Sequence, residues 1–430
     1  MIHMSTNKSN KPELRFKGFS DDWEQRKVGD CFLSLQNNTL SRAELSDENG
    51  TVMNVHYGDV LTKFSECLDV SKDRLPFIKK QFFMDKFKTS YLKNGDVIVS
   101  DTAEDETVGK CIEIIGMTNQ KVLSGLHTIP LRPKEQFATG YLGFYLNSSA
   151  YHRQLKPLMQ GIKVTSISKS AMLDTVIKYP SDIWEQTLIG QYFMSLDNLI
   201  TLHQRKCDNL KIIKKSMLDN LFPKIGEKVP KWRFKGFNND WEQRKLSDFA
   251  IKAVDNRGKT PPLSEEGTHP LIEVAALGNG NPDYSKVEKY LDDYSFRHNL
   301  RDYIKEGDIL FSTVGSIGLV SLMDSHENAV IAQNIVAFRA KQGYLPKFLY
   351  SLFSTAENQE RANRIVMAAV QPSIKVSQLV DVEYYVTNNI KEQRMLGEMF
   401  YNLDNLITLH QSELEKLQKI KKSLLERMFV

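Results

Sequence analysis

The chain has 430 residues, 41% of them hydrophobic and 26% charged, the composition of a globular protein with room for roughly two to three domains. The net charge of +4 neither supports nor excludes nucleic-acid binding, because local clustering of charge decides it. Four scattered cysteines without a CxxC pair argue against a structural zinc site, and the lack of long apolar runs argues against a transmembrane helix. We therefore expect a cytoplasmic protein with reduced thiols.

A polar tail precedes a motif that occurs twice. Residues 1–12 lack the apolar core of a signal peptide and are predicted to be a disordered tail. RFKGFSDDWEQRK at 15–27 returns as RFKGFNNDWEQRK at 233–245, with eleven of the thirteen positions identical. Repetition at a long period is typical of a duplicated architecture, so the chain is expected to consist of two equivalent halves.

The first half continues with a globular region and closes with a long helix. Residues 13–181 are predicted to form a mixed α/β domain, and residues 182–222 a proline-free helix. Apolar side chains in that helix follow one another at alternating spacings of four and three, the pattern of a coiled-coil seam. The predicted seam residues are Ile189, Phe193, Leu196, Ile200 and Leu210, and the stripe is broken at His203 and Lys214.

The second half repeats this order after a linker at residues 223–231, which is rich in Pro, Gly and Lys. Residues 232–387 are predicted to form the second domain and residues 388–430 the second helix, in which LDNLITLHQ of 196–204 returns unchanged at 403–411. The predicted seam residues here are Leu396, Phe400, Leu403, Ile407 and Leu414, with breaks at His410 and Lys421. The two seam histidines are interpreted as hydrogen-bonded or partner-specifying polar residues without chemistry.

Each long helix has an apolar stripe that it cannot bury alone. Two equivalent helices in one chain can bury each other's stripe, and an antiparallel pairing would give the chain a pseudo-twofold axis. The predicted fold class is therefore α+β, with two mixed α/β domains joined by two long helices in an antiparallel coiled coil. The alternative is that each helix packs only on its own domain.

The doubled segments resemble the specificity subunit of type I restriction–modification enzymes. The resemblance rests on PELRFKGFSDDWEQRKVGD and PKWRFKGFNNDWEQRKLSD, on the LDNLITLHQ tails ending in IKKS, and on the loops RGKTPP and STVGSIG. It implies that each divergent region is a target recognition domain for one half of a split, asymmetric duplex site. It also implies that the helices set the gap and dock two modification (methyltransferase) subunits, to which restriction (translocase/nuclease) subunits attach. S-adenosylmethionine, ATP and Mg²⁺ are then expected on those partners, and no cofactor or metal on this chain.

Polar loops within the divergent regions are candidates for DNA contact, because base and phosphate recognition use Arg, Lys, Asn, Gln, Ser and Thr. The candidates are Lys79, Lys80, Lys163, Thr165, Ser166, Arg257, Lys259, Thr260, Gln371, Ser373 and Lys375. The alternative for each is an ordinary solvated surface residue. The RFKGF motif is shared by both halves, so it is expected to do a shared task, with Phe16, Trp23, Phe234 and Trp241 as packing residues.

One segment resembles catalytic machinery. GNGNPDY at 278–284 is similar to the Asn/Asp-Pro-Pro-aromatic motif with which adenine-N6 methyltransferases hold a flipped base. Its third position is Asp283 rather than Pro, and the sequence shows no Gly-rich turn for S-adenosylmethionine and no phosphate loop. The chain is therefore expected to be a non-catalytic DNA-binding subunit. Two alternatives stay open: a coiled-coil scaffold that binds only proteins, and a stand-alone adenine methyltransferase.

Overall fold

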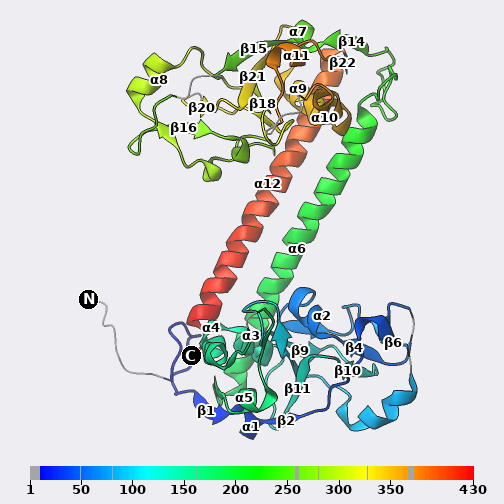
Figure 1. Ribbon diagram of the computed structural model, residues 1–430, viewed down its shortest axis with the longest axis vertical. Helices are drawn as coiled ribbons and strands as arrows, with labels where there is room; N and C mark the ends of the chain where they lie inside the picture. Colours follow the sequence, from blue (N-terminus) through cyan, green and yellow to red (C-terminus); the bar gives the residue numbers. More distant parts are fainter. Residues whose placement is uncertain are drawn as a thin grey trace. The chain divides into compact units, whose positions relative to one another are not determined.

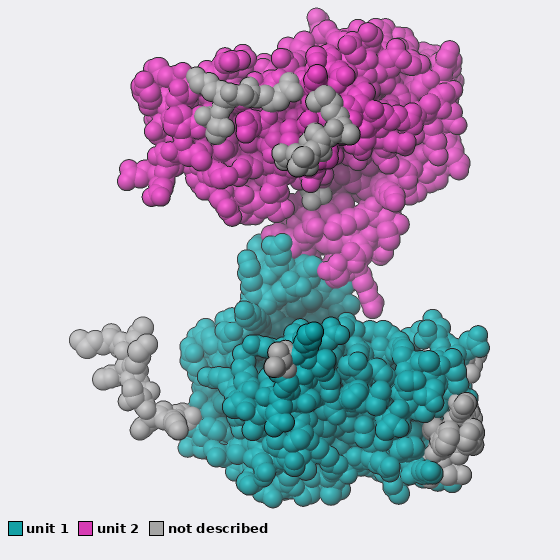
Figure 2. Space-filling model, in the orientation of Figure 1, with its two compact units in different colours: residues 1–202, 414–430 teal, residues 203–413 magenta. Residues whose placement is uncertain are grey.

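The computed structural model describes residues 10–48, 50–79, 81–161, 163–256, 261–278, 280–326, 328–366 and 372–430. Most of the predicted tail thus lies outside the described residues. The chain forms two compact units (Figure 2), unit 1 with residues 1–202 and 414–430 and unit 2 with residues 203–413. Each unit contains one globular domain, its head, and a part of both long helices.

Unit 1 is built on a five-stranded sheet in the order β2-β11-β7-β9-β5, beside a four-stranded sheet in the order β10-β4-β6-β3 (Figure 1). In the central strand β7, Val97 and Val99 belong to one hydrophobic cluster and Ile98 to another, so both faces of the sheet are covered. The strands are β1 (Glu24–Lys27), β2 (Phe32–Ser34), β3 (Leu45–Ser46), β4 (Met53–Val55), β5 (Cys67–Asp69), β6 (Phe77–Ile78), β7 (Val97–Ser100), β8 (Thr102–Ala103), β9 (Cys111–Ile115), β10 (Val122–Ser124), β11 (Thr128–Pro133), β12 (Thr165–Ser166) and β13 (Val176–Tyr179). The short α-helices are α1 (Val28–Cys31), α2 (Tyr57–Thr62), α3 (Tyr141–Asn147), α4 (Ser149–Leu155) and α5 (Lys169–Leu173).

Unit 2 has the same plan with a smaller sheet, ordered β15-β21-β18-β19 and accompanied by the three-stranded sheet β17-β16-β20. Its central strand β18 divides its side chains in the same way, with Ile309 and Phe311 in one cluster and Leu310 in another. The strands are β14 (Glu242–Lys245), β15 (Ala250–Asp255), β16 (His269–Ile272), β17 (Tyr290–Leu291), β18 (Ile309–Ser312), β19 (Val320–Leu322), β20 (Val330–Ile331), β21 (Ile335–Ala340) and β22 (Glu383–Val386). The short α-helices are α7 (Leu246–Phe249), α8 (Asp293–Asn299), α9 (Pro346–Phe353), α10 (Ala356–Asn363) and α11 (Val376–Leu379).

A buried ion pair fixes the central strand in each head. Asp96, just before β7, receives two hydrogen bonds from Arg132 on β11, and Asp308, just before β18, receives two from Arg339 on β21. Both carboxylates are buried, so the fork geometry of arginine is needed to neutralise and satisfy them. The similar sequences NGDVIVS and EGDILFS therefore mark equivalent strands of two heads that differ elsewhere.

The two long helices are α6 (Ile183–Leu221) and α12 (Ile390–Arg427). In unit 1 the Phe193 ring on α6 stacks on Phe429, which follows α12, at 5.7 Å between centroids. In unit 2 Phe222, at the other end of α6, lies 5.8 Å from Phe400 near the start of α12. Within each unit the helix segments are thus antiparallel, whereas the interlocking packing of a coiled coil stays a prediction. The mixed α+β class is confirmed.

The repeated opening motif seats each head against a helix end. Trp23 and Trp241 are only 2% and 1% exposed, and their rings contact Phe429 and Phe222 respectively. The prediction that these tryptophans are packing residues is confirmed, and Phe16 and Phe234 pack against the same two clusters.

Arginines of the same motif bind the helix starts. Arg15 donates two hydrogen bonds to Glu185 at the start of α6, and Arg233 donates two to Glu392 at the start of α12. Both glutamates are 1% exposed. Each unit thus contains one such ion pair. This explains why the arginine of RFKGF and the glutamate at the helix start both occur in the two halves.

No helix in the described part of the chain is long and apolar enough to cross a membrane. Cys31, Cys67, Cys111 and Cys207 are all free thiols.

Candidate functional site

The loop of unit 1 that carries the candidates Lys163, Thr165 and Ser166 is a tight turn beside the end of β7. Backbone hydrogen bonds join Gln160 and Ser166 in both directions, at 3.0 and 2.8 Å, and β12 pairs with β8. Gly161 has φ +116°, which a side chain would not tolerate at that turn. Lys163 and Ser166 are exposed and Thr165 is half-buried, so the turn presents polar groups to solvent.

The corresponding loop of unit 2 joins the STVGSIG segment. Ser373 forms an isolated bridge with Val314, and the Ile374 amide donates to the Thr313 carbonyl at 2.9 Å. Lys375 is exposed immediately before α11, whereas Ser373 is half-buried. Two segments that are far apart in the sequence thus form one polar edge after β18, as their counterparts do after β7.

The remaining DNA-contact candidates are divided. Lys79 is exposed but belongs to the smaller sheet of unit 1, where its Nζ donates to the Ala43 carbonyl at 2.8 Å. It therefore does not join the loop that carries Lys163. The candidates outside the described residues are Lys80, Arg257, Lys259, Thr260 and Gln371.

The predicted seam residues are all withdrawn from solvent to some degree. Seven are buried, namely Ile189, Phe193, Leu196, Leu396, Phe400, Ile407 and Leu414. Ile200, Leu210 and Leu403 are half-buried.

The two lysines that break the seam form ion pairs with the opposite helix. In unit 1 Lys421 contacts Asp197, and in unit 2 Lys214 contacts Asp404. Asp197 and Asp404 are the aspartates of the two LDNLITLHQ segments, and both lysines belong to IKKS. The same lysine–aspartate ion pair thus forms once in each unit, at the position where a lysine interrupts the apolar seam.

The two seam histidines form a hydrogen bond with each other in unit 2, which confirms the expectation that they are hydrogen-bonded. His203 and His410 have their Nδ1 atoms 3.2 Å apart and their ring centroids 5.1 Å apart. Desolvation, with Lys206 and His203 contributing, lowers the pKa of His410 below its ordinary value. Both residues are half-buried.

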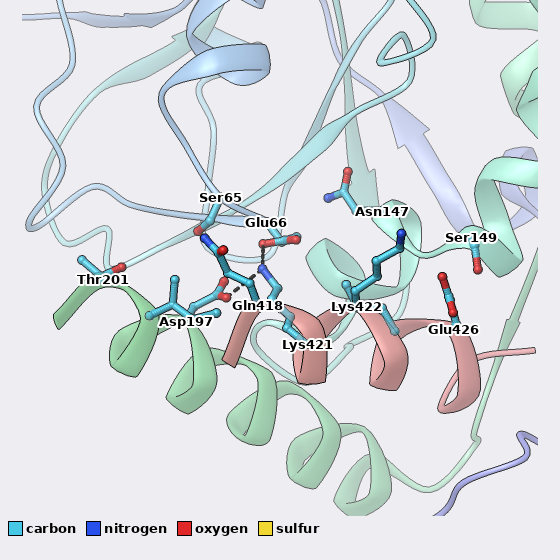
Figure 3. Close-up of a pocket in the computed structure, with 12 residues that line it drawn as sticks. Ser65, Glu66, Asn147, Ser149, Asp197, Thr201, Gln418, Lys421, Lys422 and Glu426 are labelled. Atoms are coloured by element: carbon cyan, nitrogen blue, oxygen red, sulfur yellow. Dashed lines mark hydrogen bonds and ion pairs between the residues drawn. The ribbon is translucent and has the colours of Figure 1, made fainter. Parts of the chain in front are cut away.

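A cavity of about 510 Å³, lined by charged, polar and apolar residues, opens in unit 1 between the head and the two helices. In Figure 3 Lys421 reaches from α12 toward two carboxylates, with Nζ 2.6 Å from Glu66 and 2.7 Å from Asp197. Burial and the neighbouring Glu66 raise the pKa of Asp197 to about 6. One lysine thus serves two carboxylates, an arrangement that sequence reasoning missed because Glu66 lies in a divergent region.

The equivalent aspartate of unit 2 has a different environment. Asp404 accepts hydrogen bonds from Lys214 and from the hydroxyl of Tyr350, the latter at 2.8 Å. The position of Tyr350 in the repeat is taken by Gly143 in unit 1, where a Cβ would come within 2.2 Å of the Glu66 carbonyl oxygen. The loop carrying Glu66 therefore fills the space of the tyrosine and supplies an acceptor instead of a donor.

The segment that resembles a methyltransferase motif is a satisfied turn. The Asn281 amide donates to the Leu322 carbonyl and accepts from the Tyr401 hydroxyl, at 2.7 and 2.9 Å. Tyr284 donates to Asp324 at 2.9 Å. Both polar ends of the Asn281 side chain are thus engaged by the protein, and they are not available to hold the amino group of a base.

The described residues contain no group of three or more His, Cys, Asp and Glu side chains that could hold a metal ion. The described candidate residues are lysines, serines and a threonine on projecting turns, side chains of the kinds that contact DNA phosphates and base edges.

Comparison with known proteins agrees with this arrangement. The sequence matches the family model of the type I restriction modification DNA specificity domain twice, at residues 20–211 and 238–419. Among curated proteins it is similar to two from Methanocaldococcus jannaschii. It is 22% identical to the type I restriction enzyme MjaVIII specificity subunit, covering 81% of this chain and 84% of that protein. It is also 22% identical to the putative type I restriction enzyme MjaX specificity subunit, covering 94% and 92%.

Among solved structures, the S subunit of a type I restriction–modification system from M. genitalium has a similar fold. The TM-score is 0.66 at 14% sequence identity, covering 98% of this chain and 99% of that one. Two matched domains account for the doubled motifs, the paired strand orders of the heads and the two long helices. The chain belongs to the family of type I restriction–modification DNA specificity subunits and carries two of its specificity domains.

Proposed function

We propose that each head reads one half of a split, asymmetric duplex target, and that the helices set the gap between the halves. This proposal rests on the observation that the two heads share equivalent central strands but carry different loops. β7 and β18 are each fixed by an equivalent Asp–Arg pair, yet the polar turns beside them differ in sequence. A shared scaffold with unlike loops is what two readers of different half-sites require.

The polar turns are the proposed reading elements. Lys163, Thr165 and Ser166 in unit 1, and Ser373 and Lys375 in unit 2, are fully or partly exposed. Lysine supplies phosphate contacts, and hydroxyl groups can donate to or accept from base edges. The candidates on RGKTPP, together with Lys80 and Gln371, belong to the same proposal on sequence grounds. Lys79 is assigned a backbone-phosphate role at most, because it lies on the smaller sheet.

The helices are the proposed docking surface for two modification subunits, through which restriction subunits join the complex. Apolar side chains at equivalent positions of the repeat are exposed on both helices. Leu199 and Leu406 are 46% and 44% exposed, and Leu202 and Leu409 are 46% and 54% exposed. Exposed leucines repeated on both helices suit two copies of one partner.

The chain itself is proposed to be non-catalytic and to work on DNA in the cytoplasm. The satisfied Asn281 side chain supports this against the methyltransferase alternative. S-adenosylmethionine, ATP and Mg²⁺ would then be bound by the partner subunits. Methyl transfer by the purified chain alone would contradict the proposal.

Duplex binding tests the main proposal. The target is first read from the methylated sites of cells that carry this chain with its partners, and the complex is then titrated with that duplex. We expect specific binding that is lost when the gap is changed by one base pair, and an affinity that falls steeply with salt. If the complex shows no preference for a duplex and its affinity does not depend on salt, the alternative of a coiled-coil scaffold that binds only proteins is favoured.

A further inference from the structure

The two histidines in the helix seam face each other at equivalent positions of the repeat. His203 ends the LDNLITLH segment of α6 and His410 ends the same segment of α12. Their Nδ1 atoms are 3.2 Å apart, and the rings are inclined by 69° with centroids 5.1 Å apart. Because the residues are 207 positions apart in the sequence, no local spacing could show that they form a pair.

These distances match those of two imidazoles that share one metal ion. Zinc binds imidazole nitrogen at about 2.0–2.1 Å in tetrahedral geometry, which puts the two nitrogens about 3.3 Å apart. With the size of the rings added, the ring centres are then about 5.2 Å apart. Both distances in the structure lie within about 0.2 Å of these figures, so an ion could be taken up with little movement of either helix.

The histidine pair is partly open to solvent. Both histidines are half-buried, so water can complete the coordination. On one side Cys207 and Ile407 close the seam as buried residues, with the thiol directed at the Ile407 carbonyl at 3.8 Å. Packed neighbours of this kind hold the two rings in place before a metal arrives, which favours binding.

We propose that His203 and His410 form a bidentate site for a divalent transition-metal ion of the zinc class, which links α6 to α12 within unit 2. Imidazole is a ligand that zinc, nickel and copper share, and water would occupy the remaining positions. The ion would be structural: it would strengthen the pairing of the helices and take no part in DNA recognition.

Calorimetric titration tests this proposal. The full chain, without a histidine tag and treated with EDTA, is titrated with ZnCl₂. We expect saturable binding of one Zn²⁺ per chain and a rise in Tm, because the ion binds the folded state. His203→Asn and His410→Asn should each weaken binding more than about tenfold, as loss of a ligand costs at least as much as loss of a supporting contact.

Two further variants separate ligand loss from misfolding. His410→Cys replaces imidazole by a thiol that also binds zinc, so it should retain binding that His410→Asn loses. His298→Asn removes an exposed histidine elsewhere in unit 2 and should leave the titration unchanged. Absence of saturable binding, or equal binding by the His203→Asn/His410→Asn double variant, would overturn the proposal.

Discussion

Lys421 and Asp197 form an ion pair at 2.7 Å between Nζ and Oδ1, and the residues at the same positions of the repeat, Lys214 and Asp404, form the second pair. Each pair joins α6 to α12, and each lies within its own unit. Charged residues that interrupt an apolar seam usually specify register at some cost in stability. Here the charges are matched across the helices, so each lysine that interrupts the seam meets a carboxylate of the opposite helix.

Replacing Lys421 by Met should destabilise unit 1 by about 3 kcal/mol at pH 7, because Glu66 and Asp197 are left facing each other without a cation. The pKa of Asp197 is already raised to about 6 in the presence of the lysine. A carboxyl with a raised folded-state pKa loses stability as pH rises, so the variant should recover stability as the pH falls through 6. Urea unfolding at pH 7 and pH 5 measures both effects.

Lys422→Met is the matched control for this experiment. Lys422 lines the same cavity but is exposed, and it forms no ion pair with the described residues. Its replacement should change the free energy of unfolding by less than about 0.5 kcal/mol. Equal losses for the two variants would contradict the role given to Lys421.

Replacing Arg15 by Lys should destabilise unit 1 although it keeps the charge. Arg15 donates from two nitrogens to the two oxygens of Glu185, at 2.6 and 2.8 Å, and lysine cannot form this fork. We expect a loss of about 2 kcal/mol, since Glu185 is buried and keeps only part of its hydrogen bonding. Replacing exposed Lys17 by Arg in the same motif is the control and should have little effect. If Arg15→Lys leaves the free energy of unfolding unchanged, the ion pair does not hold head and helix together.

The stability of unit 1 should fall as the pH rises from about 4.5 to about 7. Burial raises the pKa of Glu113 to about 7, while its oxygens accept hydrogen bonds from the Gly140 and Gly143 amides. Between the unfolded and folded pKa values the folded state holds more protons, so unfolding becomes easier with rising pH, by about 3 kcal/mol in total. Glu113→Gln should flatten this slope in urea unfolding. Glu48→Gln, an exposed carboxylate, should not.

Removing the exposed lysines of the two polar turns should weaken DNA binding. Lys163→Ala and Lys375→Ala are each expected to reduce affinity for the specific duplex by about tenfold and the salt slope by roughly one. Lys72→Ala removes an exposed lysine that is paired with Asp69, and it should leave both quantities unchanged. The measurement is fluorescence anisotropy of the assembled complex with a labelled duplex at several salt concentrations. An unchanged salt slope in both loop variants would exclude phosphate contacts by these turns.

The parts of the fold that the sequence predicted are those with local or repeated signals. Alternating spacings of four and three predicted the two long helices, because helix faces are set by residues close in sequence. Near-identity of the RFKGF motifs predicted that Trp23 and Trp241 pack rather than read DNA, and both are buried. The similar segments NGDVIVS and EGDILFS mark equivalent strands, but their partners Arg132 and Arg339 could not be identified, since strand pairing joins residues far apart in the chain.

The sequence by itself determined the duplicated plan, through its repeated segments, and indicated the family, through the resemblance of those segments to known proteins. It also located the apolar stripe of each long helix, because residues at helical spacing lie on one face. Only the tertiary structure decided which side chains meet: His203 with His410, Lys421 with both Glu66 and Asp197, and Asn281 with Tyr401. The reason is that these contacts depend on how distant segments pack, and a single chain carries no local record of that packing.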